Sequence, residues 1–368
     1  MIYLKPVNSS NLHYTHIVGT GGIGSGIFFL MRDNHTLGRN ESRMANLLPC
    51  KDFCKQHIIL HYISVLLGAK TGNFQSFPIG KVGNDRIGKE LIDMMKEAGM
   101  NTKYISISSG SSTLFSVCYQ YPDNTGGNIT TENSACSEVW PEDISQFFKE
   151  ENPEGRQEII LATPEVPLNA RIKLLEYGRQ RHSLNVASIL SSEADKFKSL
   201  GGFEMVDILS INIDEAKSIA QIFGETSESL TIIGSCIRTL VNINPSISIL
   251  ITDGPRGSYC YYENNLERTR VPSVQVSSTA GAGDAFLAGT ITGLCCGLPL
   301  TKGVSDNYFS ETPIKSAVEL GTLVASLSVT SRDTIHPTAD AELLFRFATQ
   351  NAVSFGADFS KIFKDCIN

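Results

Sequence analysis

The chain has 368 residues, a hydrophobic fraction of 41% and a formal net charge of −7, which is the composition of an ordinary globular protein with one large or two ordinary domains. The acidic balance argues against a nucleic-acid partner, and no apolar run approaches the ~20 residues that span a bilayer. Nine cysteines, an odd number scattered along the chain, predict reduced thiols in a cytoplasmic protein, and residues 1–10 lack the pattern of a secretory signal.

The first predicted element is a strand over 14–19 that runs directly into a glycine-rich segment. Gly19, Gly21 and Gly24 have the spacing of a dinucleotide fingerprint, which requires a helix directly afterwards and an acidic residue at the end of the next strand. Residues 27–35 are instead typical of a strand and a turn, and no acid-ended strand follows about 20 residues on. A nicotinamide-dependent oxidoreductase therefore remains an alternative that depends on these glycines alone.

A polar segment over 36–46 comes next. Arg39, Asn40 and Arg43 can hold a hydroxyl-rich ligand, or they can belong to a solvated loop, and the residues leave both interpretations open. Arginine also suits an anionic acceptor, such as a sugar acid or a sugar phosphate, because its guanidinium forms paired hydrogen bonds.

Cys50, Cys54, His57 and His61 then recur at the spacing of one helix face. Thiols and imidazoles suggest zinc, but a tetrahedral site needs four ligands that converge on one ion. Ligands spread over three turns of one helix cannot converge in this way. We therefore expect a stripe that faces the core or another subunit.

The elements expected up to residue 133 are a helix over 58–67 ended by Gly68, a strand over 77–82, a helix over 85–99, a strand over 104–107 and a hairpin over 114–131. A hairpin at this place does not fit a plain alternation of strands and helices. It predicts a small second sheet that forms a lid, with strands within 22–43 and 104–133.

Strands and helices alternate from residue 158 onward, which predicts a parallel sheet covered by helices on both faces. The last expected strand covers 269–276. Ligands of such sheets bind beyond the carboxyl ends of the strands. Three polar segments fall at these ends, at 212–215, 252–257 and 281–284.

The third polar segment carries the chemistry. The amides of Gly281, Ala282 and Gly283 would lie at the N-terminus of a new helix, where the helix dipole favours an anion. Asp284 lies in the first turn of that helix. A carboxylate would repel a bound phosphate, yet it is useful if it takes the proton of a hydroxyl that attacks the phosphorus. The alternative is an acidic residue that only stabilises the start of its helix.

The chain resembles the PfkB/ribokinase family of carbohydrate and nucleoside kinases in four segments that occur in the order of the family. The residues that carry the resemblance are Gly80-Lys-Val82-Gly83-Asn-Asp85-Arg-Ile-Gly88, Asn212-Ile-Asp-Glu215-Ala216, Thr252-Asp-Gly254-Pro-Arg-Gly257 and Thr279-Ala-Gly-Ala-Gly-Asp284-Ala-Phe286. The resemblance is strong over 155–335 and weak before 75. It implies an α/β protein with one ribokinase-like domain over 1–368, a three-layer α/β/α sandwich with a mostly parallel central sheet and a small β-sheet lid.

The resemblance also implies an ATP- and Mg²⁺-dependent kinase that transfers the γ-phosphate to a hydroxyl of a small sugar or sugar-like substrate. The residues that match the family's site are Asp284 as the base, Gly281, Ala282 and Gly283 as the anion site, Asn212 and Glu215 around Mg²⁺ through water, Thr252, Gly254 and Gly257 along the nucleotide phosphates, and Thr322 beside the adenine. Structural interpretations exist as well, since Asn212 can simply cap a helix and the two glycines can simply make a turn.

The chain departs from the family in two places. Ser278 stands where the family commonly has an aspartate that supports a monovalent cation, which puts potassium activation in doubt. The sugar-binding Asp and the Gly-Gly-x-x-x-Asn segment of the family are also replaced, which leaves Gly22, Arg39, Asn40 and Arg43 as candidates for a rebuilt substrate pocket. This rebuilding motivates a second alternative, a binding or regulatory protein that has lost turnover. Lid sheets of the family often pair between subunits, so we expect a homodimer through the lid.

Overall fold

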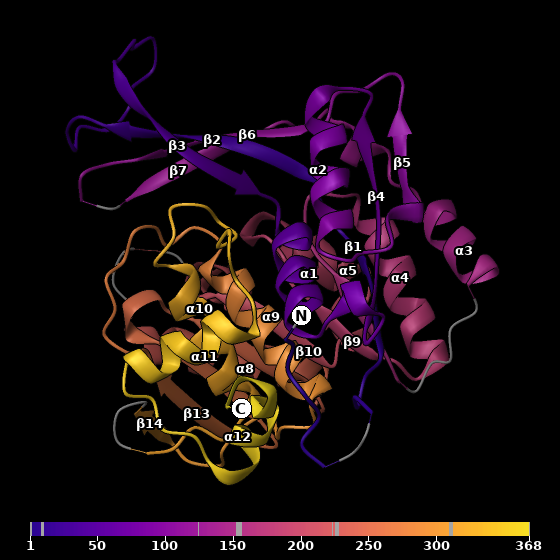
Figure 1. Cartoon of the computed structure of the whole chain (residues 1–368). Coiled ribbons are helices and arrows are strands. Elements are labelled where there is room, and N and C mark those ends of the chain that lie inside the picture. The colour runs from indigo at the N-terminus through magenta and orange to yellow at the C-terminus, as the bar shows by residue number, and fades with distance from the viewer. Residues whose placement is uncertain are drawn as a thin grey trace.

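The computed structural model describes residues 2–8, 11–123, 125–151, 157–222, 224, 228–308 and 312–367. Figure 1 shows a large body with one strand-rich arm, formed by β2, β3, β6 and β7, that extends from it above the C-terminal half. No helix among these residues has the length and apolar character that a membrane crossing requires. All nine cysteines are free thiols in the structure.

Ten strands of the described chain form the central sheet, in the order β14-β13-β12-β11-β10-β9-β8-β1-β4-β5. All neighbouring pairs from β5 to β11 are parallel, whereas β12 is antiparallel to both of its neighbours. The mostly parallel sheet is therefore confirmed. Its strands are β1 (His16–Thr20), β4 (Gln75–Gly83), β5 (Ile105–Ser108), β8 (Glu158–Ala162), β9 (Leu184–Ala187), β10 (Ile208–Asn212), β11 (Ser248–Thr252), β12 (Ser258–Tyr262), β13 (Asn265–Arg270) and β14 (Asp306–Tyr308).

Helices cover both faces of this sheet, as β8 shows. Ile159 and Leu161 belong to one hydrophobic cluster, together with α1, α9, α10 and α11, whereas Ile160 belongs to a second cluster, together with α3, α4 and α8. Successive side chains of a strand point to opposite faces, so the two clusters are the two sides of a three-layer sandwich. The helices are α1 (Lys55–Leu66), α2 (Arg86–Glu97), α3 (Pro141–Glu150), α4 (Leu168–Arg181), α5 (Ala194–Ser199), α6 (Gly202–Met205), α7 (Ile213–Ile219), α8 (Ser229–Ile243), α9 (Ala282–Cys295), α10 (Ala317–Ser328), α11 (Ala341–Gln350), α12 (Ala357–Ile362) and α13 (Lys364–Ile367).

The arm is a four-stranded sheet in the order β3-β2-β6-β7, formed by β2 (Gly24–Met31), β3 (Ala45–Phe53), β6 (Leu114–Gln120) and β7 (Gly126–Thr130). It is the small sheet that the hairpin predicted, and we call it the lid. Its strand β3 lies outside both predicted ranges, however.

The expected helix face that begins at Cys50 is therefore wrong at its first member. Cys50 belongs to β3, and Cys54 precedes the first residue of α1. Pro49 gives the physical reason, because proline breaks a helix interior yet is tolerated in an edge strand such as β3. A second expectation is also wrong: β13 ends at Arg270, and residues 271–277 form no strand. Pro272 has no amide with which to continue the ladder.

Candidate functional site

The three polar segments meet at the carboxyl edge of the central sheet. Asn212 ends β10 and Thr252 ends β11, and the two residues lie opposite each other in the parallel register. A Cβ atom placed on Gly283 would lie 3.6 Å from the Thr252 hydroxyl, which brings the start of α9 beside the same edge. The structure thus brings together segments that are far apart in the chain.

Gly281 caps the N-terminus of α9 with a φ of +76°, a left-handed conformation that favours glycine. A side chain there would also collide, since a Cβ atom would lie 2.8 Å from the Thr334 carbonyl oxygen. The Ala282 amide donates a 3.3 Å hydrogen bond to the Thr279 carbonyl. For the amides of Gly281 and Gly283 we find no acceptor within the described parts of the chain, so these two donors suit an anion.

Asp284 lies in the first turn of α9, and 13% of its side chain is exposed. Its Oδ1 atom lies 3.3 Å from the Nζ atom of Lys55, the first residue of α1. Attraction to Asp284, and then to Glu215 and Glu165, raises the pKa of the Lys55 ammonium although burial opposes the charge. Sequence reasoning missed Lys55 because no motif marks it; only its place just before an apolar helix was visible.

A cavity of about 330 Å³ separates Asp284 from the lid, within the size range of small-molecule sites. Lys55, Glu165, Asp284 and Thr334 line it on the side of the body. The lid contributes the face that includes Phe28, Asp52, Ser116, Cys118, Gln120 and Asn128. The base candidate therefore faces a partly open space with the size of one small ligand.

Two further carboxyl groups of the cavity were also missed. Burial raises the pKa of Asp52 to about 6 and that of Glu165 to about 7, while the Lys55 ammonium partly offsets the shift of Glu165. Glu165 has a φ of +74°, which is rare for a residue other than glycine. Gly22 packs against it, because a Cβ atom on Gly22 would lie 2.3 Å from the Glu165 Oε2 atom. The candidate Gly22 therefore makes room for Glu165 but does not itself line the cavity.

Asn212 and Glu215 form a reciprocal cap at the start of α7. The Asn212 side-chain oxygen accepts a hydrogen bond from the Glu215 backbone amide, and the Glu215 carboxylate accepts one from the Asn212 backbone amide, each over 2.8 Å. Within the described ranges, no three His, Cys, Asp or Glu side chains converge as metal ligands. This donor set fits Mg²⁺ only in the manner typical of that ion, with water and phosphate oxygens as most of the ligands.

The loop after β11 contains an ion pair. Asp253 is buried and pairs with Arg256 through two hydrogen bonds of 2.6 and 2.7 Å. Gly254 and Gly257 have positive φ angles of 52° and 97°. Thr322 on α10 is only 2% exposed, and its hydroxyl donates to the Val318 carbonyl over 3.0 Å. The Thr322 hydroxyl is thus engaged within the fold.

The candidates Arg39, Asn40 and Arg43 lie in the loop between β2 and β3, and none of them lines the cavity. Arg39 and Asn40 are exposed. The Arg43 guanidinium binds the Asp33 carboxylate and the His35 carbonyl of the same loop. The structure does not bring these residues to Asp284.

The dinucleotide fingerprint lacks its required context. Gly19 lies within β1 and Gly24 begins β2, so the glycines connect two strands and no helix follows them. The pyrophosphate of a dinucleotide would need that helix N-terminus.

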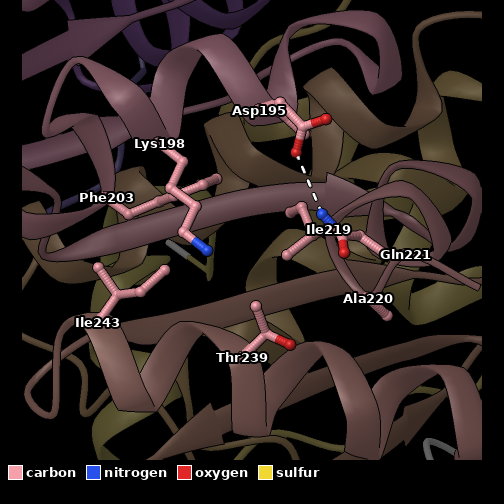
Figure 2. A pocket seen from close by; sticks show the side chains of 9 residues that line it. Asp195, Lys198, Phe203, Ile219, Ala220, Gln221, Thr239 and Ile243 are labelled. Atoms are coloured by element: carbon pink, nitrogen blue, oxygen red, sulfur yellow. Dashed lines mark hydrogen bonds between the residues drawn. The ribbon is translucent and has the colours of Figure 1, made fainter.

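A second cavity, of about 90 Å³, lies beside α5, α7 and α8 and is shown in Figure 2. The Gln221 side chain donates a 3.4 Å hydrogen bond to Asp195 at one side of it, and Phe203, Ile219 and Ile243 supply apolar walls. None of the residues predicted for the site lines this cavity.

Comparison with known proteins identifies the family and the fold. The model of the pfkB family carbohydrate kinases matches residues 62–341. The fold is similar to a ribokinase from Arabidopsis thaliana complexed with ribose and ATP, with 16% identity, a TM-score of 0.66 and coverage of 91% of this chain and 98% of that one. A ribokinase from Cryptococcus neoformans in complex with ADP has 16% identity and a TM-score of 0.69, and the match covers 90% of this chain and 99% of that one. A nucleoside kinase from Burkholderia thailandensis in complex with inosine has 14% identity and a TM-score of 0.66, and the match covers 90% of this chain and 98% of that one.

Proposed function

We propose that this chain, which belongs to the pfkB family of carbohydrate kinases, transfers the γ-phosphate of ATP to a hydroxyl of a small sugar or sugar-like acceptor. One observation carries the proposal. The carboxylate of Asp284 lies at the start of α9, next to the amides of Gly281 and Gly283, and it faces a cavity large enough for one acceptor. A base, an anion site and an acceptor space therefore adjoin one another.

In the proposed reaction, an acceptor hydroxyl in the cavity gives its proton to the Asp284 carboxylate. Its oxygen attacks the γ-phosphorus, the bond from this phosphorus to the β–γ bridging oxygen breaks, and the electron pair leaves with ADP. The amides of Gly281 and Gly283 stabilise the negative charge on the group in transfer. Positioning and charge stabilisation of this kind supply most of the rate in phosphoryl transfer.

The phosphates of the nucleotide would lie along Thr252, Gly254 and Gly257, beyond the end of β11. Glu215 would hold a water of the Mg²⁺ ion that accompanies ATP, since magnesium keeps several of its waters. The ion would neutralise charge on the phosphates. Glu215 is buried next to Asn212, which fixes the carboxylate for this purpose.

Charge in the cavity favours a neutral acceptor over an anionic one. Asp52 and Glu165 would repel an anion, and Lys55, the one cation among the described lining residues, is already paired with Asp284. Carboxylates accept hydrogen bonds from sugar hydroxyls instead. A sugar acid or sugar phosphate that is phosphorylated faster than its neutral analogue would contradict this choice.

The experiment that tests the function measures ADP formation by the purified protein with a panel of pentoses, hexoses, nucleosides and their acidic analogues. Turnover with a neutral member is the expected result. Binding of ATP without consumption across the whole panel would instead favour a binding or regulatory protein.

We also infer that the lid pairs with a second copy of the chain. Partner residues of neighbouring strands point to the same side of a sheet, which places Phe29 beside Leu47, and Ile27 beside Val117 and Ile129, on the face away from the cavity. Leu47 is 60% exposed and Ile129 is 70% exposed. An apolar face of this kind suits an isologous contact between two lids.

A further inference from the structure

Lys55 occupies the point where the two halves of the proposed reaction meet. Its ammonium lies 3.3 Å from the Asp284 carboxylate. Of the acidic neighbours that stabilise the ammonium, Glu215 belongs to the nucleotide side and Glu165 belongs to the acceptor cavity. A group in transit from nucleotide to acceptor must pass between these two sides.

The environment keeps Lys55 charged. Attraction to the surrounding carboxylates outweighs burial, so the pKa of its ammonium is raised above the usual value. No other lysine or arginine appears among the described residues that line the cavity. Any positive charge that the protein supplies to the reacting group from within this cavity must therefore come from Lys55.

The ion pair has a cost for catalysis. The ammonium contacts the Oδ1 atom of Asp284, so it engages the carboxylate to which the acceptor hydroxyl must donate. That oxygen becomes available to the hydroxyl when the ammonium moves to a stronger anion. The γ-phosphoryl group carries more negative charge than one carboxylate, and it arrives beside Asp284 when substrates bind.

We propose that Lys55 is a catalytic residue whose ammonium leaves Asp284 and binds the γ-phosphoryl group during transfer. The exchange of partners frees the Asp284 carboxylate to accept the hydroxyl proton at the moment when phosphorus is attacked. Lys55 keeps its own proton throughout, and the bonds that form and break are those of the transfer itself. This inference rests on the proposed function and goes beyond it, because it couples arrival of the phosphate to activation of the base.

Two measurements on the variant Lys55→Gln test the role. The first is steady-state turnover, where kcat falls by about 10²–10³-fold, as when one stabilising donor of a transition state is removed, while the KM for ATP stays within threefold. The second is calorimetric binding of ADP alone and of ADP with aluminium fluoride, which mimics the group in transfer, each with Mg²⁺ and acceptor. The wild type prefers the fluoride complex, and Lys55→Gln loses most of that preference.

Lys51→Gln is the matched control, because Lys51 is an exposed lysine on the adjoining strand β3. It should leave both readouts at the wild-type values. Lys55→Arg keeps a cation and should recover at least tenfold of the lost kcat. Thermal unfolding identifies variants that fail to fold. If Lys55→Gln does not fold, Lys55→Arg carries the test, and a folded Arg variant without the fluoride preference overturns the role.

The outcomes separate the two claims. A wild type that transfers no phosphate to any acceptor overturns the proposed function and this inference together. An active wild type that Lys55→Gln matches, both in kcat and in the preference for the fluoride complex, overturns the role of Lys55 alone.

Discussion

The backbone amide of Phe53, at the end of lid strand β3, donates a 3.0 Å hydrogen bond to the hydroxyl of Thr334. The Thr334 amide donates to the Lys51 carbonyl over 3.1 Å, and the Lys51 amide donates to Asp333 over 2.8 Å. The Thr334 carbonyl also packs against Gly281, which caps α9, since a Cβ atom on Gly281 would lie 2.8 Å from the carbonyl oxygen. One short loop therefore holds the root of the lid and contacts the turn that would bind the phosphate.

Thr334→Val should loosen the root of the lid. The change keeps the shape of the side chain but leaves the buried Phe53 amide without its acceptor, at a cost of about 1–3 kcal/mol. We expect hydrogen exchange of peptides that span β3 to accelerate about tenfold or more and the KM for the acceptor to rise. Thr334→Ser keeps the hydroxyl and should behave as the wild type. Equal hydrogen-exchange rates of the β3 peptides in Thr334→Val and in the wild type would show that the hydrogen bond from Phe53 to Thr334 does not hold the lid.

Two histidines of α1, the buried His57 and the partly buried His61, should make the fold sensitive to acid. Burial lowers the pKa of His57 to about 3 and that of His61 to about 4, so both stay neutral in the folded protein. The unfolded chain binds these protons below about pH 6.5. The free energy of unfolding should therefore fall as the pH drops below 6.5, by up to ~1.4 kcal/mol per pH unit for each histidine.

Urea unfolding at pH 7.5, 6.5 and 5.5 measures this slope. The double variant His57→Leu, His61→Leu removes both titrations and should flatten the slope relative to the wild type. Other groups titrate equally in both proteins, so parallel slopes would argue against the buried neutral histidines.

Glu165 should make acceptor binding depend on pH near neutrality. Its pKa is raised to about 7 by burial, so the carboxyl group gains a proton as the pH falls through 7. A hydrogen bond from a hydroxyl to a charged carboxylate is about twice as strong as one to a neutral group. The KM for the acceptor should rise several-fold between pH 8.5 and pH 6, and Glu165→Gln should have a high KM that no longer varies. A wild-type KM that is constant over this range would exclude Glu165 as a ligand of the acceptor.

The proposed lid contact predicts a change of oligomeric state. Ile129→Asp places a charge in the centre of the exposed apolar face and should convert a dimer into a monomer, as measured by light scattering after size exclusion. Trp140→Asp is the control, because Trp140 is a large exposed side chain outside the lid. A wild type that is already monomeric would remove the basis for the contact.

Periodicity and turn chemistry were sufficient for the parallel part of the central sheet, because each of its strands and the next helix are encoded by neighbouring residues, whereas the bounds of β13 were wrong and β14 was not predicted. The convergence of Asn212, Thr252 and Gly283 also followed, since parallel strands end at one edge. Strand β3 could not be foreseen, because its pairing with β2 across a bulge depends on tertiary contacts. Lys55 and Glu165 come from segments more than 100 residues apart, and no local pattern announces that they share a cavity.

The central claim is that Asp284 takes the proton of the acceptor hydroxyl. The most direct measurement compares Asp284→Asn with the wild type, by phosphate transfer to the best acceptor and by calorimetric binding of ATP with Mg²⁺. Because a general base contributes about 10²–10⁴-fold, we predict a fall of this size in kcat with ATP binding unchanged within twofold. A folded Asp284→Asn protein that phosphorylates the acceptor at the wild-type rate would contradict the account.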